Sequence, residues 1–371
     1  MLAWRAMRIA RVAVVGAALA VALTGIIGLM IVRAARPSQP VTHYQVALEV
    51  PAKDAALWFV ARYPKYFTSG EQGLEAWLGT LHERDREFVV AMGQTLAWAW
   101  IEHELAGFHD RDLEGLARES TVAVRRKTLN QLELDIESLA ETEGVDLLAY
   151  IGDPMFSAGI FARLVRGASN CEGQNHLIAV LLESALDSNE GWMPAPKVDM
   201  AGLSIHHDIA IVTGPTLAQP VYVDGWGNLP AFTVDPSLPH AAPLLGDLGD
   251  PPAEVLPGFA GRSPAAAEVY AEASVAHVEV LPPRNAPTKA VDLEVRAPVL
   301  DAAYLAKVKS PWQLYLFARV LHLYDDPRAA ELYQLVLDRH CRDPRSRHRI
   351  YVCVASALFL AADHRGKIVI N

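Results

Sequence analysis

Most of this sequence lacks an excess of positive charge, because acidic residues outnumber basic ones. The 371-residue chain has a formal net charge of −10 at pH 7, although residues 1–36 contain five arginines and no acidic residue. With those five positive charges set apart from the total of −10, the remainder of the chain carries a formal net charge of −15. A protein that binds nucleic acid presents a basic surface to the phosphates. The composition therefore excludes nucleic acid as a partner of this acidic body.

Cysteine is scarce as well, because the chain contains only Cys171, Cys341 and Cys353. In an oxidising compartment Cys341 and Cys353 could form a disulfide, which would leave Cys171 as the free thiol. That pairing agrees with a catalytic role for Cys171. Two buried free thiols at positions 341 and 353 are an equally good interpretation, so the cysteine count leaves the disulfide open.

Charge is absent from residues 12–32, which are mostly Val, Ala, Leu and Ile. An apolar run of this length spans the roughly 30 Å hydrocarbon core of a bilayer. Three arginines precede the run and two follow it closely, an asymmetry that predicts a cytoplasmic N-terminus. The run is long for a signal-peptide core and no Ala-x-Ala site follows, so we predict an uncleaved, single-pass signal anchor rather than a cleaved peptide. The catalytic body is then expected outside the cytoplasm, which is the periplasm if the source is a Gram-negative bacterium.

The chain also lacks, at His103 and His109, the spacing that is typical of a zinc-binding helix. His103 and His109 are six residues apart, whereas the two histidines of a zinc helix are four apart. We therefore predict no metal site there, and we expect no cofactor.

Cys171 lies near the predicted start of a helix. Ser169 and Glu172 form a Ser-x-x-Glu capping box with Ser169 as the N-cap, which puts Cys171 in the first turn. The unpaired N–H groups and the positive end of the helix dipole there stabilise a thiolate. Gly167 allows the backbone turn that directs such a residue outward. A lone cysteine is more often a small buried residue, so a nucleophile needs support from the rest of the sequence.

Two strands are predicted after that helix. Residues 204–212 alternate as a strand does, with His207 on the apolar face and His206 on the other face. Residues 220–228 form a second strand closed by a Gly-rich turn, with Asp224 at its end. The Gly and Pro between the strands suit a loop that joins antiparallel neighbours. Because a shift of one residue would exchange the two faces, His206 is kept as the alternative to His207.

The order of Cys171 on a helix, His207 on a strand and Asp224 at the end of the next strand resembles the transglutaminase-like superfamily. That papain-like group includes transglutaminases, bacterial proteases and peptide amidases. The Cys-Glu-Gly sequence ending at Gly173 is similar to the Cys-x-Gly start of its bacterial members. The resemblance covers roughly residues 150–235.

The sequence departs from the family pattern in places. Asp208 and Ile209 stand where the family's His-Ala-Trp strand has Ala and Trp. The related arylamine acetyltransferases have a Cys-x-Glu-x-Asn motif, and Asn175 matches its Asn. Gly173 replaces the Glu of that motif, which counts against a small-molecule acyl transferase.

The resemblance implies a role for each residue of a catalytic triad. The Cys171 thiolate would attack a carbonyl carbon and form an acyl-enzyme. His207 would take the thiol proton and return it to the leaving amine, while Asp224 would orient the imidazole and stabilise its cation. The oxyanion would be bound by the backbone N–H of Cys171 and by one side chain, for which Gln174 and Asn175 are the available guesses.

The rest of the chain is expected to surround this core. After the anchor at residues 1–36, a helical region covers residues 37–150 and the core covers residues 151–300. A Pro-rich excursion at residues 236–264 could cover the cleft. Residues 301–371 are predicted to form a helical domain whose three stretches are broken at two Asp-Pro pairs.

The predicted fold class is α+β: a papain-like core in which the Cys171 helix packs on an antiparallel sheet, a helical N-terminal region, a C-terminal helical cap and one transmembrane helix. The first functional hypothesis is a membrane-anchored thiol enzyme that cleaves or transfers amide bonds of a protein or peptide. The second is a catalytically degenerate transglutaminase-like domain that binds a protein partner on its C-terminal helices. The third is a small-molecule acyl transferase of the arylamine-acetyltransferase type.

Overall fold

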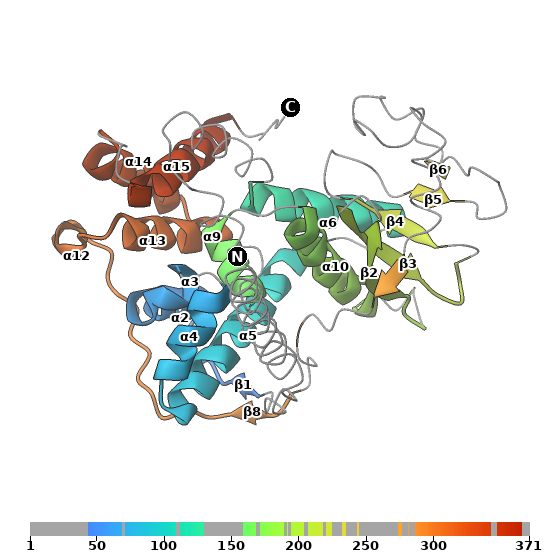
Figure 1. Cartoon of the computed structure of the whole chain (residues 1–371), viewed down its shortest axis with the longest axis horizontal. Coiled ribbons are helices and arrows are strands. Elements are labelled where there is room, and N and C mark those ends of the chain that lie inside the picture. The colour runs from blue at the N-terminus through green and yellow to red at the C-terminus, as the bar shows by residue number, and fades with distance from the viewer. Residues whose placement is uncertain are drawn as a thin grey trace, which may run out of the picture. The chain divides into compact units, whose positions relative to one another are not determined.

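The computed structural model (Figure 1) describes part of the chain. The described residues are 44–68, 71–108, 112–129, 159–167, 171–188, 191, 194–203, 207–217, 220–224, 232–234, 243–244, 274–276, 281, 286–342 and 347–365. The chain divides into two units, Met1–Thr42 and His43–Asn371, and every described residue belongs to the second. The predicted anchor at residues 12–32 and nearly all of the excursion at residues 236–264 lie outside the described part. Within that part, no helix is both long enough and apolar enough to cross a bilayer.

Helices and strands are both present, so the α+β class is confirmed. The N-terminal helices are α2 (Ala52–Arg62), α3 (Pro64–Thr68), α4 (Glu71–Thr80), α5 (Glu83–Leu105) and α6 (Leu113–Lys127). Helix α6 shows how local sequence sets their ends: the side chain of Asp112 accepts a 2.8 Å hydrogen bond from the Gly115 N–H at its start. Three basic residues close its last turn, where positive charge complements the helix dipole.

Two further helices follow in the middle of the chain, α9 (Ile160–Arg166) and α10 (Cys171–Asp187). Helix α9 ends at Gly167, whose φ of 77° is left-handed. A Cβ on this glycine would also lie 2.5 Å from Nε of Arg319, so both the backbone and the packing require Gly. The predicted helix start at Cys171 is confirmed, although it lies one residue later than a cap at Ser169 would place it. Ser169 itself is outside the described residues.

The main sheet has six antiparallel strands in the order β6-β5-β4-β3-β2-β7. Its strands are β2 (Lys197–Leu203), β3 (His207–Thr213), β4 (Val221–Val223), β5 (Phe232–Val234), β6 (Pro243–Leu244) and β7 (Ser274–Ala276). The predicted antiparallel pairing of the two strands that carry His207 and precede Asp224 is confirmed, with Ala210 opposite Val223. Strand β2 was not predicted, although it pairs with β3 along its whole length.

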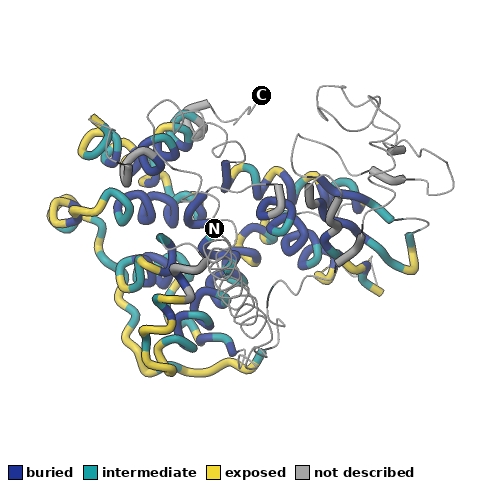
Figure 2. The backbone as a smooth tube through the Cα atoms, in the orientation of Figure 1, coloured by how far each residue is buried: buried dark blue, intermediate teal, exposed yellow. Residues whose placement is uncertain are grey.

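Both faces of the sheet are buried at its centre. Ala210 and Val212 of β3 belong to the main hydrophobic core, and α10 packs on β2 and β3. Ile209 and Ile211 lie on the opposite face by the alternation of the strand, and they are also buried. Helix α10 is buried between residues 173 and 182 except at His176, because α5 and α6 also pack against it (Figure 2).

A second, two-stranded sheet joins the beginning of the described chain to a late segment. Strand β1 (Gln45–Val46) pairs in parallel with β8 (Thr288–Lys289). The Val46 N–H donates a 2.9 Å hydrogen bond to the Thr95 hydroxyl, which fastens β1 to α5. The chain that leads from β8 to the C-terminal helices is extended and only partly buried (Figure 2).

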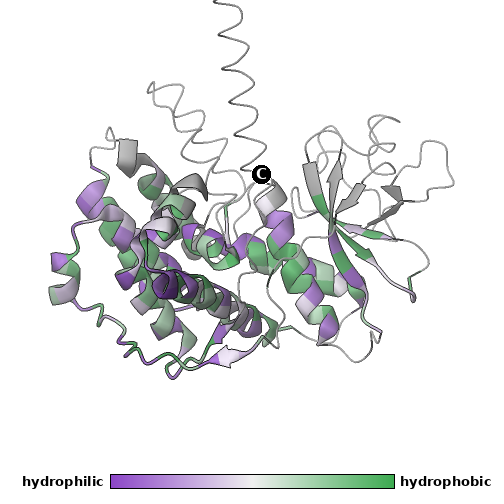
Figure 3. Cartoon of the chain, turned by 60° about the horizontal axis from the view of Figure 1, so that its bottom comes forward, coloured by the Kyte–Doolittle hydropathy of each residue, from purple (hydrophilic) through white to green (hydrophobic). Residues whose placement is uncertain are grey.

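The C-terminal helices are α12 (Ala302–Lys307), α13 (Pro311–Leu323), α14 (Arg328–His340) and α15 (Arg347–Arg365). The three predicted helical stretches and the break at Asp326-Pro327 are therefore confirmed, whereas Asp343-Pro344 lies outside the described residues between α14 and α15. Ser310 caps α13 by accepting from the Gln313 N–H, and Pro311 occupies the first turn, where proline is tolerated. Figure 3 shows that hydrophobic and hydrophilic residues alternate along the helices of the described chain.

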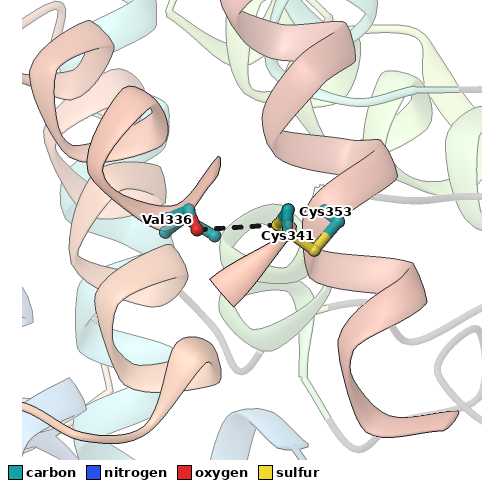
Figure 4. Close-up of a disulfide and its surroundings, with 3 residues drawn as sticks. All are labelled: Val336, Cys341 and Cys353. Atoms are coloured by element: carbon teal, nitrogen blue, oxygen red, sulfur yellow. Dashed lines mark hydrogen bonds between the residues drawn. A yellow bond between two sulfur atoms is a disulfide. The ribbon is translucent and has the colours of Figure 1, made fainter. Parts of the chain in front are cut away.

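A disulfide joins Cys341, at the end of α14, to Cys353 in α15 (Figure 4). The Cα atoms of the two residues are 5.6 Å apart, and Sγ of Cys341 lies 3.5 Å from the carbonyl oxygen of Val336. The question that the cysteine count left open is thus answered in favour of the bond. Cys171 is the third and last cysteine of the chain.

Buried cations fasten the C-terminal helices to α6 and α9. Arg319 of α13 is fully buried and donates to the carbonyl oxygens of Lys127 and Leu164, the latter at 2.7 Å. Its guanidinium also lies 3.9 Å from the ring centroid of Phe359 in α15. Because a buried charge is costly unless it is paired and hydrogen-bonded, these contacts determine how α13 packs on α6 and α9.

Lys127 reaches across in the opposite direction. Its Nζ donates to the carbonyl oxygens of His322 and Leu323, at 2.9 and 3.1 Å, and so caps the end of α13. The same ammonium lies 3.3 Å from a Glu104 oxygen and 2.9 Å from an Asp325 oxygen. Burial lowers the pKa of Lys127, and the charge of Glu104 opposes that shift. The two carboxylates therefore hold a charged lysine inside the protein.

We expect Lys127→Met to lower the free energy of unfolding by roughly 3 kcal/mol, because it removes the buried cation beside the Glu104 carboxylate and leaves only the more exposed Arg126, 3.5 Å away. Lys309→Met, at an exposed site, is the matched control and should change stability by less than about 0.5 kcal/mol. Urea unfolding measures both variants. Equal, small losses would show that the Lys127 contacts do not stabilise the docking of α13.

Candidate active site

The candidate site is built on the first turns of α10. Cys171 is the first residue of that helix, and Asn175 follows four positions later, on the same side of the helix. The Asn175 side chain donates a 3.2 Å hydrogen bond from Nδ2 to Oδ1 of Asp224. Asp224, which was predicted at the end of the second strand, thus contacts α10 on the side of the helix where Cys171 lies.

Asp224 is a buried carboxylate. It follows β4 directly, and neither its side chain nor that of Asn175 is exposed to solvent. An ionised carboxylate is costly to bury unless a charge or hydrogen-bond donors compensate it. Asn175 supplies one donor, and α6 supplies the charge.

That charge is Arg125, which the sequence did not single out. Burial lowers the pKa of Arg125 to about 10, and the negative charge of Asp224 opposes that shift. Arg125 comes immediately before Arg126 and Lys127 in the last turn of α6. A basic helix end of this kind is expected from the dipole alone, so no local signal pointed to a partner at Asp224.

His207 is the first residue of β3 and pairs with Leu203 of β2. By the alternation of the strand, position 207 has the parity of Ile209 and Ile211, whereas Ala210 and Val212 face the core that α10 covers. The side chains of Cys171 and His207 lie outside the described part of the structure, so their contact stays a prediction. His206, the alternative base, is also outside it.

His176 is a second residue that the sequence did not flag. Its Nδ1 lies 2.7 Å from Nη1 of Arg163, so this contact links α10 to α9. Burial, and then the charge of Arg163, lowers the pKa of His176 to about 4. The imidazole is therefore neutral near pH 7, and because the guanidinium can only donate, Nδ1 is the accepting nitrogen. Gln174, a guessed oxyanion donor, is also fully buried beside Asn175.

His103, one of the two histidines whose spacing does not fit a zinc-binding helix, belongs to a different group of charged residues. Possible ligand atoms of His103, Glu104 and Asp325 lie within 4.8 Å of one another. Lys127 contacts both carboxylates, and Arg126 does so at 3.5 and 3.3 Å. These cations make the group an ion-pair network at the docking site of α13. His109 lies outside the described residues.

Comparisons of the chain with protein-family models, with curated proteins and with solved structures found no match.

The neutral His176 predicts a pH dependence of stability. The unfolded chain binds a proton on this histidine near pH 6.5, whereas the folded protein takes it up only near pH 4. The unfolded state therefore binds more protons between these values, and the free energy of unfolding should fall by roughly 2–3 kcal/mol as the pH drops from 6.5 to 4. His176→Gln should remove this part of the loss.

Urea unfolding at pH 7, 5.5 and 4 checks this expectation. His82→Gln is the control, because His82 is an exposed histidine that precedes α5. An unchanged pH dependence in His176→Gln would mean that the histidine is already charged in the folded protein.

Proposed function

We propose that this protein is a thiol enzyme that cleaves or transfers amide bonds of a protein or peptide through an acyl-enzyme on Cys171. The observation that carries the proposal is the hydrogen bond from Asn175 to Asp224. It ties the helix that begins at Cys171 to the carboxylate expected for the triad. The neighbouring strand β3 begins at His207. A Cys-led helix on an antiparallel sheet, with His and Asp on adjacent strands, is the arrangement expected of a papain-like core.

The disulfide supports the same proposal from the other end of the chain. Because Cys341 and Cys353 are bonded to each other, Cys171 is the remaining cysteine that can supply a thiol. Stable disulfides belong mainly to oxidising compartments. The bond therefore supports an extracytoplasmic body, as the predicted signal anchor at residues 12–32 also does.

The proposed chemistry assigns one role to each residue of the triad. Backbone N–H groups at the start of α10 favour the thiolate of Cys171, which attacks the substrate carbonyl. His207 takes the thiol proton and later returns it to the leaving amine, while Asp224 orients the imidazole. Water would then release an acid, or a second amine would form a new amide bond. His206 is the alternative base, since it differs from His207 by one position and therefore by one strand face.

One observation favours a second candidate, a catalytically degenerate domain that binds a protein on its C-terminal helices. Asn175 donates to Asp224, and the charge of Asp224 acts on Arg125, which are partners that a purely structural carboxylate would also have. A carboxylate held in this way could be purely structural. The reactivity of Cys171 distinguishes the two functions.

We expect iodoacetamide to label Cys171 rapidly near neutral pH, because the thiolate is the attacking species. Under non-reducing conditions the disulfide protects Cys341 and Cys353, so mass spectrometry reports on a single site. Cys171→Ala should abolish labelling and turnover of peptide amides. His207→Ala should slow labelling about tenfold or more, whereas His206→Ala serves as its neighbour control.

Three outcomes bear on the proposal. Slow labelling in His207→Ala alone supports the triad as stated, and slow labelling in His206→Ala alone transfers the role of base to His206. Labelling of wild-type Cys171 no faster than that of an ordinary exposed thiol would contradict the enzyme and favour the binding domain.

The membrane orientation gives a separate prediction. With three arginines before residues 12–32 and two after, the body should be exported. Alkaline phosphatase fused after Asn371 should therefore be active, since it folds only when exported, and green fluorescent protein fused there should stay dark. Bright fluorescence without phosphatase activity would show that the body stays in the cytoplasm.

A further inference from the structure

Asp224 is held by two elements that are far from it in the sequence. Asn175 of α10 donates to its Oδ1 at 3.2 Å, and Arg125 of α6 interacts with its charge. The bond from Asn175 therefore joins α10 to the end of β4, while α10 itself packs against both α6 and β3.

The packing around Asn175 does not by itself require a polar side chain. Its side chain is fully buried, and the following residues Leu177 and Ile178 show that apolar side chains fit the same helix. A buried amide costs free energy unless it is hydrogen-bonded, so an apolar residue at position 175 would be tolerated better if burial were the only requirement. The bond to Asp224 accounts for the amide.

We propose that Asn175 is a positioning residue of the thiol site: its amide holds Asp224 in register with the helix that begins at Cys171. This inference rests on the proposed function. A carboxylate has two oxygens with about four acceptor sites, so a bond from Asn175 and a bond from an imidazole N–H are compatible on the same group. Asn175 thereby acts through Asp224 on the histidine and, through the histidine, on the thiol.

Exchanging the two side chains separates positioning from simple stabilisation. Asn175→Asp alone brings two carboxylates within hydrogen-bonding distance and should lower the melting temperature. Adding Asp224→Asn restores an N–H···O bond and the original net charge, so the melting temperature should return toward that of the wild type. The charge, however, now belongs to α10 instead of the end of β4.

The decisive measurement is the rate of Cys171 alkylation by iodoacetamide between pH 5 and pH 9. Asn175→Asp and the exchanged pair should both raise the midpoint of this profile by about one pH unit, which slows labelling at pH 7 about tenfold. Arg125→Met should shift the midpoint in the same direction. Arg118→Met should not, because Arg118 is an exposed residue of the same helix that pairs with Glu114.

Recovery of both the melting temperature and the labelling profile in the exchanged pair would overturn the inference, since any hydrogen bond would then suffice. Unchanged profiles in Asn175→Asp and Arg125→Met would overturn it as well. If Asn175→Asp does not fold, Asn175→Ser keeps a shorter donor and permits the same comparison. If Cys171 of the wild type is alkylated slowly, with the pH profile of an ordinary thiol, the proposed function itself is rejected, whatever the melting temperatures show.

Discussion

The enclosure of α10 is the constraint on which the candidate site depends. The helix packs on β2 and β3 on one side and on α5 and α6 on the other, so its middle is buried almost all round. Any polar residue in this stretch needs a partner from another element. Asn175 finds Asp224, and His176 finds Arg163. These two contacts orient the helix that begins at Cys171, and a site at its first turn inherits that orientation.

A similar constraint governs the C-terminal helices. Arg319 and Lys127 are fully buried, and each bonds to backbone carbonyls of the element opposite. The left-handed Gly167 lets Arg319 approach the end of α9 closely. Helix α13 packs against α2, α3 and α9, so the C-terminal helices share one unit, His43–Asn371, with the rest of the described chain. The disulfide adds a covalent link between α14 and α15.

Much of the secondary structure could be predicted, because its signals are local. Asp326-Pro327 separates α13 from α14, and the alternation of β3 predicted a strand antiparallel to β4. Strand β2 escaped prediction, although Val198 and Met200 alternate on its core face. Its pairing with β3 involves residues on both strands, and a weak pattern in a short segment does not reveal such a partner.

By itself, the sequence determined that Cys171 would lie in the first turn of a helix and Asp224 at the end of a strand, since caps, alternation and turn residues act over a few positions. Only the tertiary structure decided that Asn175 donates to Asp224 and that the charge of Asp224 acts on Arg125. It also decided that Cys341 and Cys353 form a disulfide. The physical reason is that burying a charge requires partners but does not specify where in the chain they come from. That choice is made when the helices and the sheet pack against each other.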